Sequence, residues 1–416
     1  MPALQPVRGT HDLLPEEKRR HRFVEATARA LAERYGYAEI STPIFEFTEV
    51  FQRTLGDTSD IVTKEMYTFV DKGGDRITLR PEYTAAVARA FLSNGLAQHL
   101  PLKVFCAGPM FRYERPQKGR LRQFHQVDVE ILGVAEAVAD VEIIALGAHF
   151  LEALGLKEKV ALEVNTLGDS ESRNAYRQVL VGYLQDHKSR ISPESLLRLE
   201  RNPLRIFDSK DASDQAAVTG APLLQESLND ASKRYFEQLR RGLDAAGVAY
   251  ALNPRLVRGL DYYCHAAFEF VTDALGAQGA VLAGGRYDGL IEQLGGPPTP
   301  GTGWAAGIER LSMLVAEPPP PPRPIAVLAV GDGAEPKAVQ LAQQLRRNGF
   351  IVEMPMTGNL KKRMKQANKA RARAAVMLGE DELARGAATL RDMDTGEQAE
   401  VPIDALPERL ARYREE

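Results

Sequence analysis

The chain has 416 residues, of which 44% are hydrophobic and 26% charged, and its formal net charge is −3. This composition is ordinary for a globular protein, and the length allows two or three domains with separate cores. The small net charge gives no global sign of nucleic-acid binding, so any RNA contact must come from a local basic patch.

Membrane and disulfide-rich classes are excluded as well. No stretch approaches the roughly 20 uncharged apolar residues of a membrane helix, and the N-terminal residues lack the apolar segment of a secretion signal. The two cysteines, Cys106 and Cys264, have no CxxC spacing, which argues against a disulfide framework or a zinc site. This cysteine usage is typical of a reducing cytoplasm, where we expect the protein to reside.

The first part of the chain predicts strands with helices set between them. A helix is expected at about residues 15–35, and strand-like runs follow: ITLRP, KVFCAGPMFRYE, QFHQVDVEILG and AFEFVT. Such an order fits an α+β domain built on an antiparallel sheet. Between roughly residues 170 and 250 the pattern turns helical and polar, which indicates an insertion into the sheet domain.

The proline-rich segment 317–324 (EPPPPPRP) is the clearest domain boundary, because a proline run forms a stiff, extended spacer. Beyond it, strands and helices alternate in the order PIAVLAVGD, EPKAVQLAQQLRRNG, IVEMP, NLKKRMKQANKARAR and AAVMLG. This alternation over fewer than a hundred residues predicts a compact α/β domain with a largely parallel sheet.

Residues 111–133 (FRYERPQKGRLRQFHQVDVEILG) predict a strand, a basic loop and a second strand. Because alternate residues of a strand share a face, Gln126, Asp128 and Glu130 are expected on one side and His125 on the other. On the first strand, Arg112 and Glu114 also share a face.

The loop of this hairpin is rich in cations that could meet a triphosphate or an RNA end: Arg115, Lys118, Arg120 and Arg122. Phe124 could stack on a base. No phosphate-loop motif GxxxxGK[ST] occurs, so bound phosphate would depend on such arginines. The residues alone leave a solvated hairpin with a charged tip as the alternative.

Residues 111–133 resemble motif 2 of the class II aminoacyl-tRNA synthetases, in the form found in histidyl-tRNA synthetases. Further peptides of that family have counterparts here in the family's order: RGTHDLLPEE (8–17), LRPEYTAAVAR (79–89), LVRGLDYYCHAAFEF (256–270), LAGGRYDGL (282–290) and GTGWAAGIERL (301–311), which resembles motif 3. One such peptide is weak evidence, but the ordered set, which covers the first three hundred or so residues, is highly specific.

The resemblance implies the fold class and the domains. The fold would be α+β, with a class II antiparallel-sheet catalytic domain at residues 1–322 and a helical insertion at roughly 170–250. An α/β anticodon-binding domain would follow at residues 323–416. Residues 42–56 resemble motif 1, the dimer element of class II enzymes, which implies a homodimer.

The resemblance also implies the reaction: ATP-dependent activation of L-histidine to histidyl-adenylate, and transfer to the 3′ end of tRNA(His) with release of AMP and pyrophosphate. Mg²⁺ would neutralise the β- and γ-phosphates of ATP. No metal is expected on protein ligands alone.

Residue roles follow where the sequence matches the family's motifs. The expected catalytic residues are Arg112 and Arg258, both at the α-phosphate. The expected ATP-binding residues are Arg112, Glu114, Arg120, Phe124 and Arg310. The expected histidine-binding residues are Glu82, Thr84, Arg112, Gln126, Glu130, Arg258, Tyr262 and Tyr263. The expected contacts to the tRNA acceptor end are Arg115, Gln117 and Arg122.

Within the histidine set, Glu82 and Thr84 would hold the α-amino group, and Glu130 and Tyr263 would face the imidazole. Structural interpretations exist for single residues: Glu82 could simply begin a helix, where acidic residues are favoured, and Arg310 could be a helix-end cation. His125 is interpreted as structural.

Two alternatives of the same family remain. One is the non-catalytic regulatory subunit that partners ATP phosphoribosyltransferase, which lacks the C-terminal domain and usually loses the ATP-clamping residues. The other is a synthetase for proline, threonine or glycine. The LVRGLDYY peptide and Glu130 favour histidine.

The basic stretch 361–373 (KKRMKQANKARAR) has no acidic residue and is predicted to be helical. It could contact RNA phosphates, or it could be a solvated helix face, and both interpretations stay open.

Overall fold

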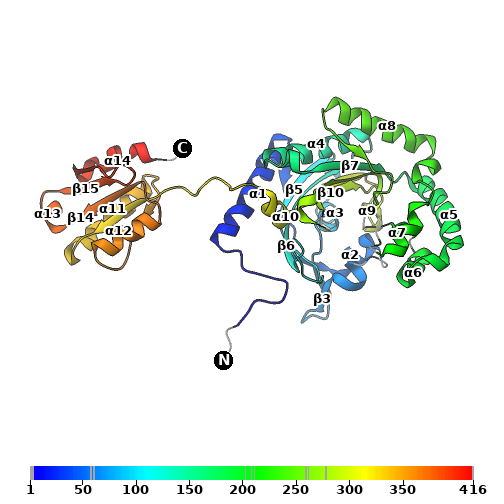
Figure 1. The fold of residues 1–416 in the computed structure, drawn as a ribbon, viewed down its shortest axis with the longest axis horizontal. Helices are drawn as coiled ribbons and strands as arrows, with labels where there is room; N and C mark the ends of the chain where they lie inside the picture. The colour runs from blue at the N-terminus through cyan, green and yellow to red at the C-terminus, as the bar shows by residue number, and fades with distance from the viewer. Residues whose placement is uncertain are drawn as a thin grey trace. The chain divides into compact units, whose positions relative to one another are not determined.

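The structure is a computed structural model (Figure 1) that describes residues 4–56, 59, 61–201, 203–207, 209, 211–257, 260, 262–276 and 279–414. Arg258, one of the two residues predicted to be catalytic, lies outside the described residues. The chain divides into two compact units, Met1–Pro318 and Pro319–Glu416, inside the proline-rich segment. No helix in the described ranges is long and apolar enough to cross a membrane.

An antiparallel sheet forms the centre of the first unit. Among its described residues, eight strands pair in the order β1-β5-β6-β11-β10-β9-β7-β8. Their bounds are β1 (Ala38–Glu39), β5 (Leu102–Phe111), β6 (Gln123–Leu132), β7 (Ala161–Thr166), β8 (Ala251–Leu252), β9 (Cys264–Val271), β10 (Ala280–Arg286) and β11 (Gly301–Gly307). The inner strands pair antiparallel with one another, whereas the edge strands β1 and β8 pair in parallel with β5 and β7. The α+β prediction is therefore confirmed.

One face of this sheet is covered by helices and forms the larger core. The covering helices are α1 (Pro15–Arg34), α4 (Ala137–Ala153), α8 (Asp230–Ala245) and α10 (Ile308–Leu314). Strand β6 packs Val127, Val129 and Ile131 into this core, and the residues between them turn to the opposite face. On that opposite face lie α2 (Thr48–Leu55), α3 (Thr84–Ser93) and α9 (Leu290–Gln293).

A small antiparallel sheet carries an exposed apolar row. Its strands are β2 (Phe45–Phe47), β3 (Tyr67–Val70) and β4 (Arg76–Leu79), in the order β2-β4-β3. Phe47 and Phe69 both pair with Ile77, from opposite sides, so the three side chains lie in one row across the sheet. Phe47 and Phe69 are 59% and 46% exposed.

The helical region predicted as an insertion has a core of its own. Helices α5 (Ser170–Asp186), α6 (Pro193–Arg201) and α7 (Ala212–Thr219) bury Tyr176, Leu180 and Val218 together. The following helix α8 instead packs Leu239 and Leu243 into the main core. The separate core therefore ends before α8, although the sequence pattern placed both in one insertion.

The second unit is a mixed α/β domain. Its sheet has the order β13-β12-β14-β15-β16 in the described residues, with bounds β12 (Ile325–Ala329), β13 (Val352–Glu353), β14 (Ala374–Leu378), β15 (Ala387–Asp392) and β16 (Gln398–Pro402). Strands β12, β13 and β14 are parallel as predicted, but β15 and β16 add antiparallel pairings. The prediction of a largely parallel sheet is thus correct only for the first three strands.

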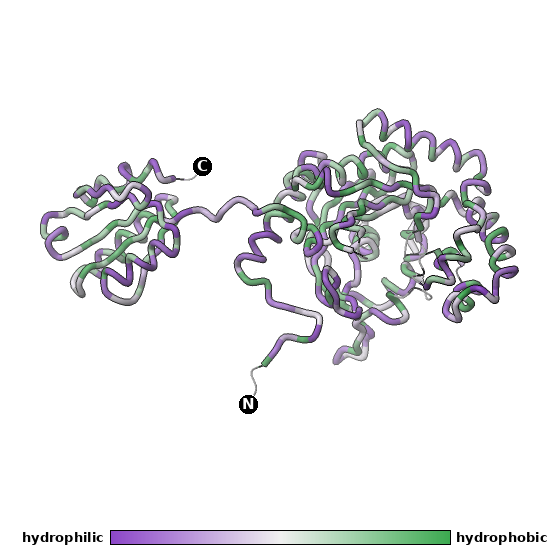
Figure 2. The backbone as a smooth tube through the Cα atoms, in the orientation of Figure 1, coloured by the Kyte–Doolittle hydropathy of each residue, from purple (hydrophilic) through white to green (hydrophobic). Residues whose placement is uncertain are grey.

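Helices cover both faces of this second sheet. They are α11 (Glu335–Arg347), α12 (Leu360–Lys369), α13 (Glu380–Ala384) and α14 (Leu406–Arg409). Helices α11 and α14 pack on one face, and α12 packs Ala367 on the other. Figure 2 shows hydrophobic (green) backbone along the strands inside each unit and hydrophilic (purple) backbone along much of the outer helices. Each unit therefore has its own core.

Candidate active site

A cavity of about 440 Å³ opens on the sheet face opposite the large core. It lies between the start of α3, the β5–β6 hairpin, β10, β11 and α10. The predicted site residues that line it are Glu82, Thr84, Arg112, Glu114, Arg120, Phe124, Gln126, Tyr262, Tyr263 and Arg310. Residues from distant parts of the sequence thus meet at one cavity, as their predicted roles require.

Arginines line one end of the cavity. The guanidinium of Arg112 lies 5.2 Å from the ring centre of Phe124, and its Nε donates to the Pro81 carbonyl at 2.9 Å. Arg310 donates to the carbonyls of Gly119 (3.0 Å) and Ala280 (2.7 Å). Burial, followed by the charge of Arg120, lowers the pKa of Arg310. An anion bound here would relieve the repulsion among these cations.

Glu114 and Arg120 are engaged with each other. Their Oε2 and Nε atoms are 2.7 Å apart, although neither atom has a well-directed hydrogen bond among the described residues. Strand β5 ends at Phe111, so Arg112 and Glu114 lie just beyond the strand on which they were predicted. The pair engages one oxygen of Glu114 and one nitrogen of Arg120, and it leaves the other carboxylate oxygen and the terminal guanidinium nitrogens for the predicted contacts to adenine and phosphate.

Acidic residues line the other end. Glu82 accepts a hydrogen bond from the Ala85 backbone N–H (2.7 Å) and one from the Tyr262 hydroxyl (3.3 Å). It therefore caps the start of α3, as the structural interpretation suggested, and also lines the cavity. Burial raises the pKa of this carboxyl.

Glu130 lies beneath the cavity surface. Its carboxyl accepts hydrogen bonds from the Thr84 hydroxyl (2.6 Å) and the Tyr287 hydroxyl, and burial raises its pKa to about 8. A Cβ at Gly303, opposite on β11, would lie 1.5 Å from Glu130 Oε2, so glycine is required there. The predicted contact between Glu130 and the imidazole stays a prediction, since Thr84 and Tyr287 occupy its oxygens here.

Sequence reasoning missed the role of Tyr287, although the LAGGRYDGL peptide contains it. The neighbouring Arg286 is fully buried and structural. It donates to Asp140 at 3.0 Å and to the Val134 carbonyl at 2.9 Å. Arg286 therefore stabilises the core, whereas its neighbour Tyr287 holds Glu130 in place beneath the cavity.

The tip of the hairpin carries the residues predicted to contact the tRNA acceptor end. Arg115 and Gln117 are exposed, and Gln117 and Arg120 exchange backbone hydrogen bonds that close the turn. Arg122 packs its guanidinium 3.8 Å from the ring centre of Tyr113 and donates to the Glu114 carbonyl at 3.2 Å. None of these three predicted tRNA contacts lines the cavity.

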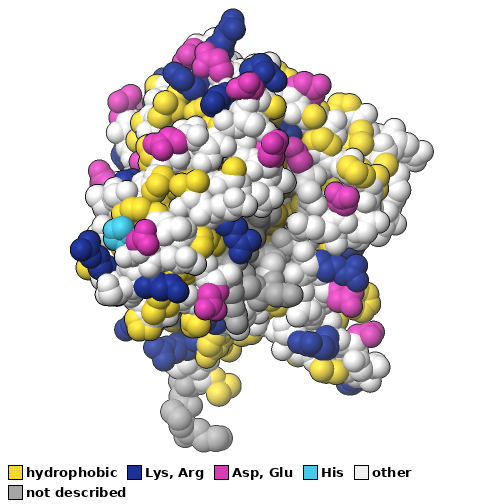
Figure 3. All heavy atoms as spheres, turned by 90° about the vertical axis from the view of Figure 1, so that its right-hand side faces the viewer, with side chains coloured by type: hydrophobic (Ala, Val, Ile, Leu, Met, Phe, Trp, Pro, Cys, Tyr) yellow, Lys and Arg dark blue, Asp and Glu magenta, His cyan; other side chains and the backbone are white. Residues whose placement is uncertain are grey.

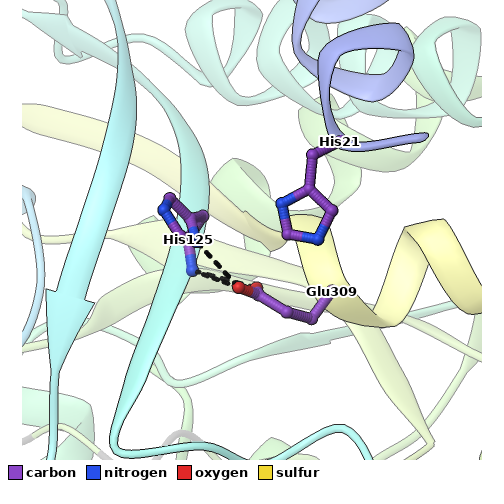
Figure 4. Close-up of side chains that lie close together, drawn as sticks. All are labelled: His21, His125 and Glu309. Carbon is purple, nitrogen blue, oxygen red and sulfur yellow. Dashed lines mark hydrogen bonds and ion pairs between the residues drawn. The ribbon is translucent and has the colours of Figure 1, made fainter. Parts of the chain in front are cut away.

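His125 faces away from the cavity, as predicted, and joins His21 of α1 and Glu309 of α10 (Figure 4). Glu309 accepts from the His125 backbone N–H (2.9 and 3.0 Å), and its Oε1 lies 2.8 Å from the ring Nδ1. The ligand atoms of this trio lie within 4.8 Å of one another, so its side chains are of a type that could hold a metal ion. The expectation of no metal on protein ligands alone stays a prediction.

Comparison with known proteins links both units to one family. A family model described as histidyl-tRNA synthetase matches residues 9–311, and one described as an anticodon binding domain matches residues 324–413. The chain is 60% identical over 414 residues to the histidine–tRNA ligase of Rhodospirillum rubrum, covering 99% of this chain and 100% of that protein. It is 56% identical over 411 residues to that of Gluconacetobacter diazotrophicus, covering 99% of each.

A solved structure is also similar to this chain over almost its full length. The apo histidyl-tRNA synthetase of S. aureus has a TM-score of 0.83 and 35% sequence identity, covering 98% of this chain and 99% of that one. The similarity therefore extends over the whole chain and is not confined to the cavity.

Proposed function

This chain belongs to the histidyl-tRNA synthetase family, and we infer that it is a histidine–tRNA ligase. It activates L-histidine with ATP and transfers it to the 3′ end of tRNA(His). The observation that carries this inference is the full-length match to histidine–tRNA ligases, which includes a C-terminal unit of the anticodon-binding type. The regulatory-subunit alternative lacks that domain.

The test is ATP–pyrophosphate exchange measured with each of the twenty amino acids. We expect exchange that depends on histidine, together with charging of tRNA(His) in a separate assay. Exchange that depends instead on proline, threonine or glycine would show that the family assignment had given the wrong amino acid. No exchange with any amino acid would favour the regulatory subunit.

The proposed chemistry is an in-line attack of the histidine carboxylate on the α-phosphorus of ATP. Negative charge builds on the phosphate oxygens, so positioning and fixed positive charge supply most of the rate enhancement. Arg112 would hold the α-phosphate, with Arg258 as its proposed partner. Arg120 and Arg310 would hold the outer phosphates, and Phe124 and Glu114 would contact adenine.

The acidic end would select the amino acid. Glu82 and Thr84 would hold the ammonium group of histidine, and Gln126 would line the pocket. Tyr262 would fix Glu82 through its hydroxyl. Tyr263 and the deeper Glu130 would read the imidazole, which has one donor and one acceptor nitrogen. A side chain without those groups would leave buried polar atoms unpaired, and this supplies specificity.

Mg²⁺ is proposed as the ion that neutralises the β- and γ-phosphates of bound ATP. On the arginine side of the cavity, Glu114 is engaged with Arg120. The described side chains there fit an ion held mainly by phosphate oxygens and water, which Mg²⁺ prefers.

RNA contacts are proposed for both units. In the catalytic unit, Arg115, Gln117 and Arg122 would meet the acceptor end from the hairpin. On the face in Figure 3, which includes the helical region, Lys and Arg side chains are interspersed with Asp and Glu among the coloured residues. No continuous basic patch of the kind that binds RNA phosphates is visible among the coloured side chains of that face.

In the second unit, the basic helix α12 has one buried side and one exposed side. Arg363 is buried, and it donates to the Ala329 carbonyl and to Glu335, both at 2.8 Å. Lys361, Lys362 and Lys365 are exposed. This supports RNA binding through the lysines only. We keep residues 1–322 as the proposed catalytic domain and 323–416 as the proposed anticodon-binding domain.

A homodimer is proposed, assembled through the small sheet of the motif 1 region. The row of exposed Phe47 and Phe69, with half-buried Ile77 between them, is the kind of surface that a second copy of the chain would cover. Sedimentation at micromolar concentration should give about twice the 45.8 kDa of one chain. The double variant Phe47→Asp/Phe69→Asp should shift the protein toward monomer, and a wild-type monomer would contradict the proposal.

A cytoplasmic location is proposed as well. Both cysteines are free and buried, which agrees with a reducing compartment.

A further inference from the structure

Asp128 is a buried carboxylate of the cavity wall for which the proposed chemistry has no use. It lies on β6 between Gln126 and Glu130, on the same face as both, and is 1% exposed. Its Oδ2 atom is buried and has no hydrogen-bond partner among the described residues. Glu82 and Glu130, by contrast, each accept two hydrogen bonds through their carboxyl oxygens.

Arg80 and Arg112 are the described arginines whose charge acts on Asp128, and their hydrogen bonds among the described residues go to other groups. Arg80 donates to the carbonyls of Thr42 (2.7 Å) and Pro109 (3.0 Å) and to the Tyr83 hydroxyl (2.9 Å). Arg112 turns its Nε to the Pro81 carbonyl. Neither arginine therefore donates a hydrogen bond to Asp128 among the described residues, although the charge of each lowers its pKa.

The surroundings of Asp128 are acidic instead. Burial, followed by the charges of Glu130 and Glu82, raises the pKa of the Asp128 carboxyl. An unpaired buried carboxylate beside two others costs stability, and a ligand that supplied the missing partner would offset that cost. The ligand that this group of acids would accept is a cation.

We propose that Asp128 binds the α-ammonium group of histidine, as a third acidic residue of the amino-acid pocket. This inference rests on the proposed function. Gln126, Asp128 and Glu130 follow one another along β6 at intervals of about 6.6 Å. With the histidine carboxylate near Gln126 and Arg112 and its ring near Glu130, the ammonium group falls beside Asp128.

The test is the variant Asp128→Asn, which keeps the shape of the side chain and removes its charge. The KM for histidine in pyrophosphate exchange should rise about 10- to 100-fold, as expected for loss of a charge-assisted contact. The KM for ATP should stay within about twofold. The unfolding temperature without ligand should be unchanged or higher, because a buried charge without a partner has been removed.

Two analogues identify the group that Asp128 contacts. Histidinol keeps the ammonium group and the imidazole, whereas imidazolepropionate lacks the ammonium group. As competitors of histidine, histidinol should bind the variant more weakly than wild type, by a factor similar to that for histidine. Imidazolepropionate should bind both proteins equally. Equal weakening of both analogues would overturn the assignment to the ammonium group.

Asp140→Asn is the matched control, since Asp140 is equally buried but is paired with Arg286 away from the cavity. It should lower the unfolding temperature and leave the histidine KM of the folded enzyme unchanged. A histidine KM for Asp128→Asn within twofold of wild type would overturn the inference. If the wild-type enzyme shows no histidine-dependent exchange, the proposed function itself has failed.

Discussion

Replacing Arg112 by alanine should lower the rate of histidine-dependent pyrophosphate exchange by about two to three orders of magnitude. Arg112 lines the cavity beside Phe124, and its Nε is fixed by the Pro81 carbonyl. The guanidinium is therefore held in place before ATP binds, and it can stabilise developing negative charge on the α-phosphate without reorganisation. A group acting this way affects the chemical step, so single-turnover adenylate formation at saturating ATP and histidine is the decisive measurement.

The variant Arg112→Lys provides the comparison. Lysine keeps a positive charge but loses the planar fork that can contact two oxygens, so its rate should lie between those of wild type and Arg112→Ala. Both variants must show wild-type circular dichroism before their rates are interpreted. If Arg112→Ala forms adenylate within a few-fold of the wild-type rate, Arg112 does not hold the α-phosphate.

The hairpin around Arg112 was predictable because its signal is local. Strand alternation from Gln126 to Glu130 sets which side chains share a face, and the structure confirms that Gln126 and Asp128 line the cavity while His125 turns away. The depth of each side chain along that face was not predictable. Glu130 lies deeper because Thr84 and Tyr287, far away in sequence, cover its oxygens.

The ion pair of Glu114 with Arg120 and the burial of Arg286 in the core could not be predicted from the sequence either. A sequence shows that these residues are charged but does not show which opposite charge is nearest. Strand alternation placed Asp128 on the same face as Gln126 and Glu130, yet only the structure reveals that its Oδ2 has no hydrogen-bond partner among the described residues. The family motifs therefore predicted most of the charged and aromatic residues that line the cavity. Only the structure shows which contacts these residues make.

The missed strand β16 and the misassigned packing of α8 have a related cause. Strand β16 is as long as β12 and β14 but mostly exposed, so it lacks the apolar run that marks those two strands. Helix α8 has a polar sequence, and only the partners of Leu239 and Leu243 place it in the main core. Both assignments depend on contacts between segments distant in sequence, which local patterns do not encode.

Cutting the chain after Pro320 should give a fragment that still activates histidine but charges tRNA(His) at least about a hundredfold less well. Every described residue that lines the cavity lies at or before Arg310. The end of the first unit is held by Arg19, which donates to the Pro318 carbonyl at 2.7 Å and pairs with Glu317. The cut leaves these contacts intact, so the fragment keeps its core and its cavity.

The two assays separate the two proposed domains. Loss of the exposed lysines of α12 removes phosphate contacts, so the residual charging by the fragment should depend less steeply on salt than that of the whole chain. Circular dichroism must first show that the fragment is folded. A folded fragment that charges tRNA(His) as well as the whole chain would exclude an anticodon-binding role for the second unit. A folded fragment that cannot form adenylate would mean that the second unit supplies part of the active site. Activation without efficient charging is the result expected if phosphate clamp and amino-acid pocket belong to one unit and tRNA affinity depends on both.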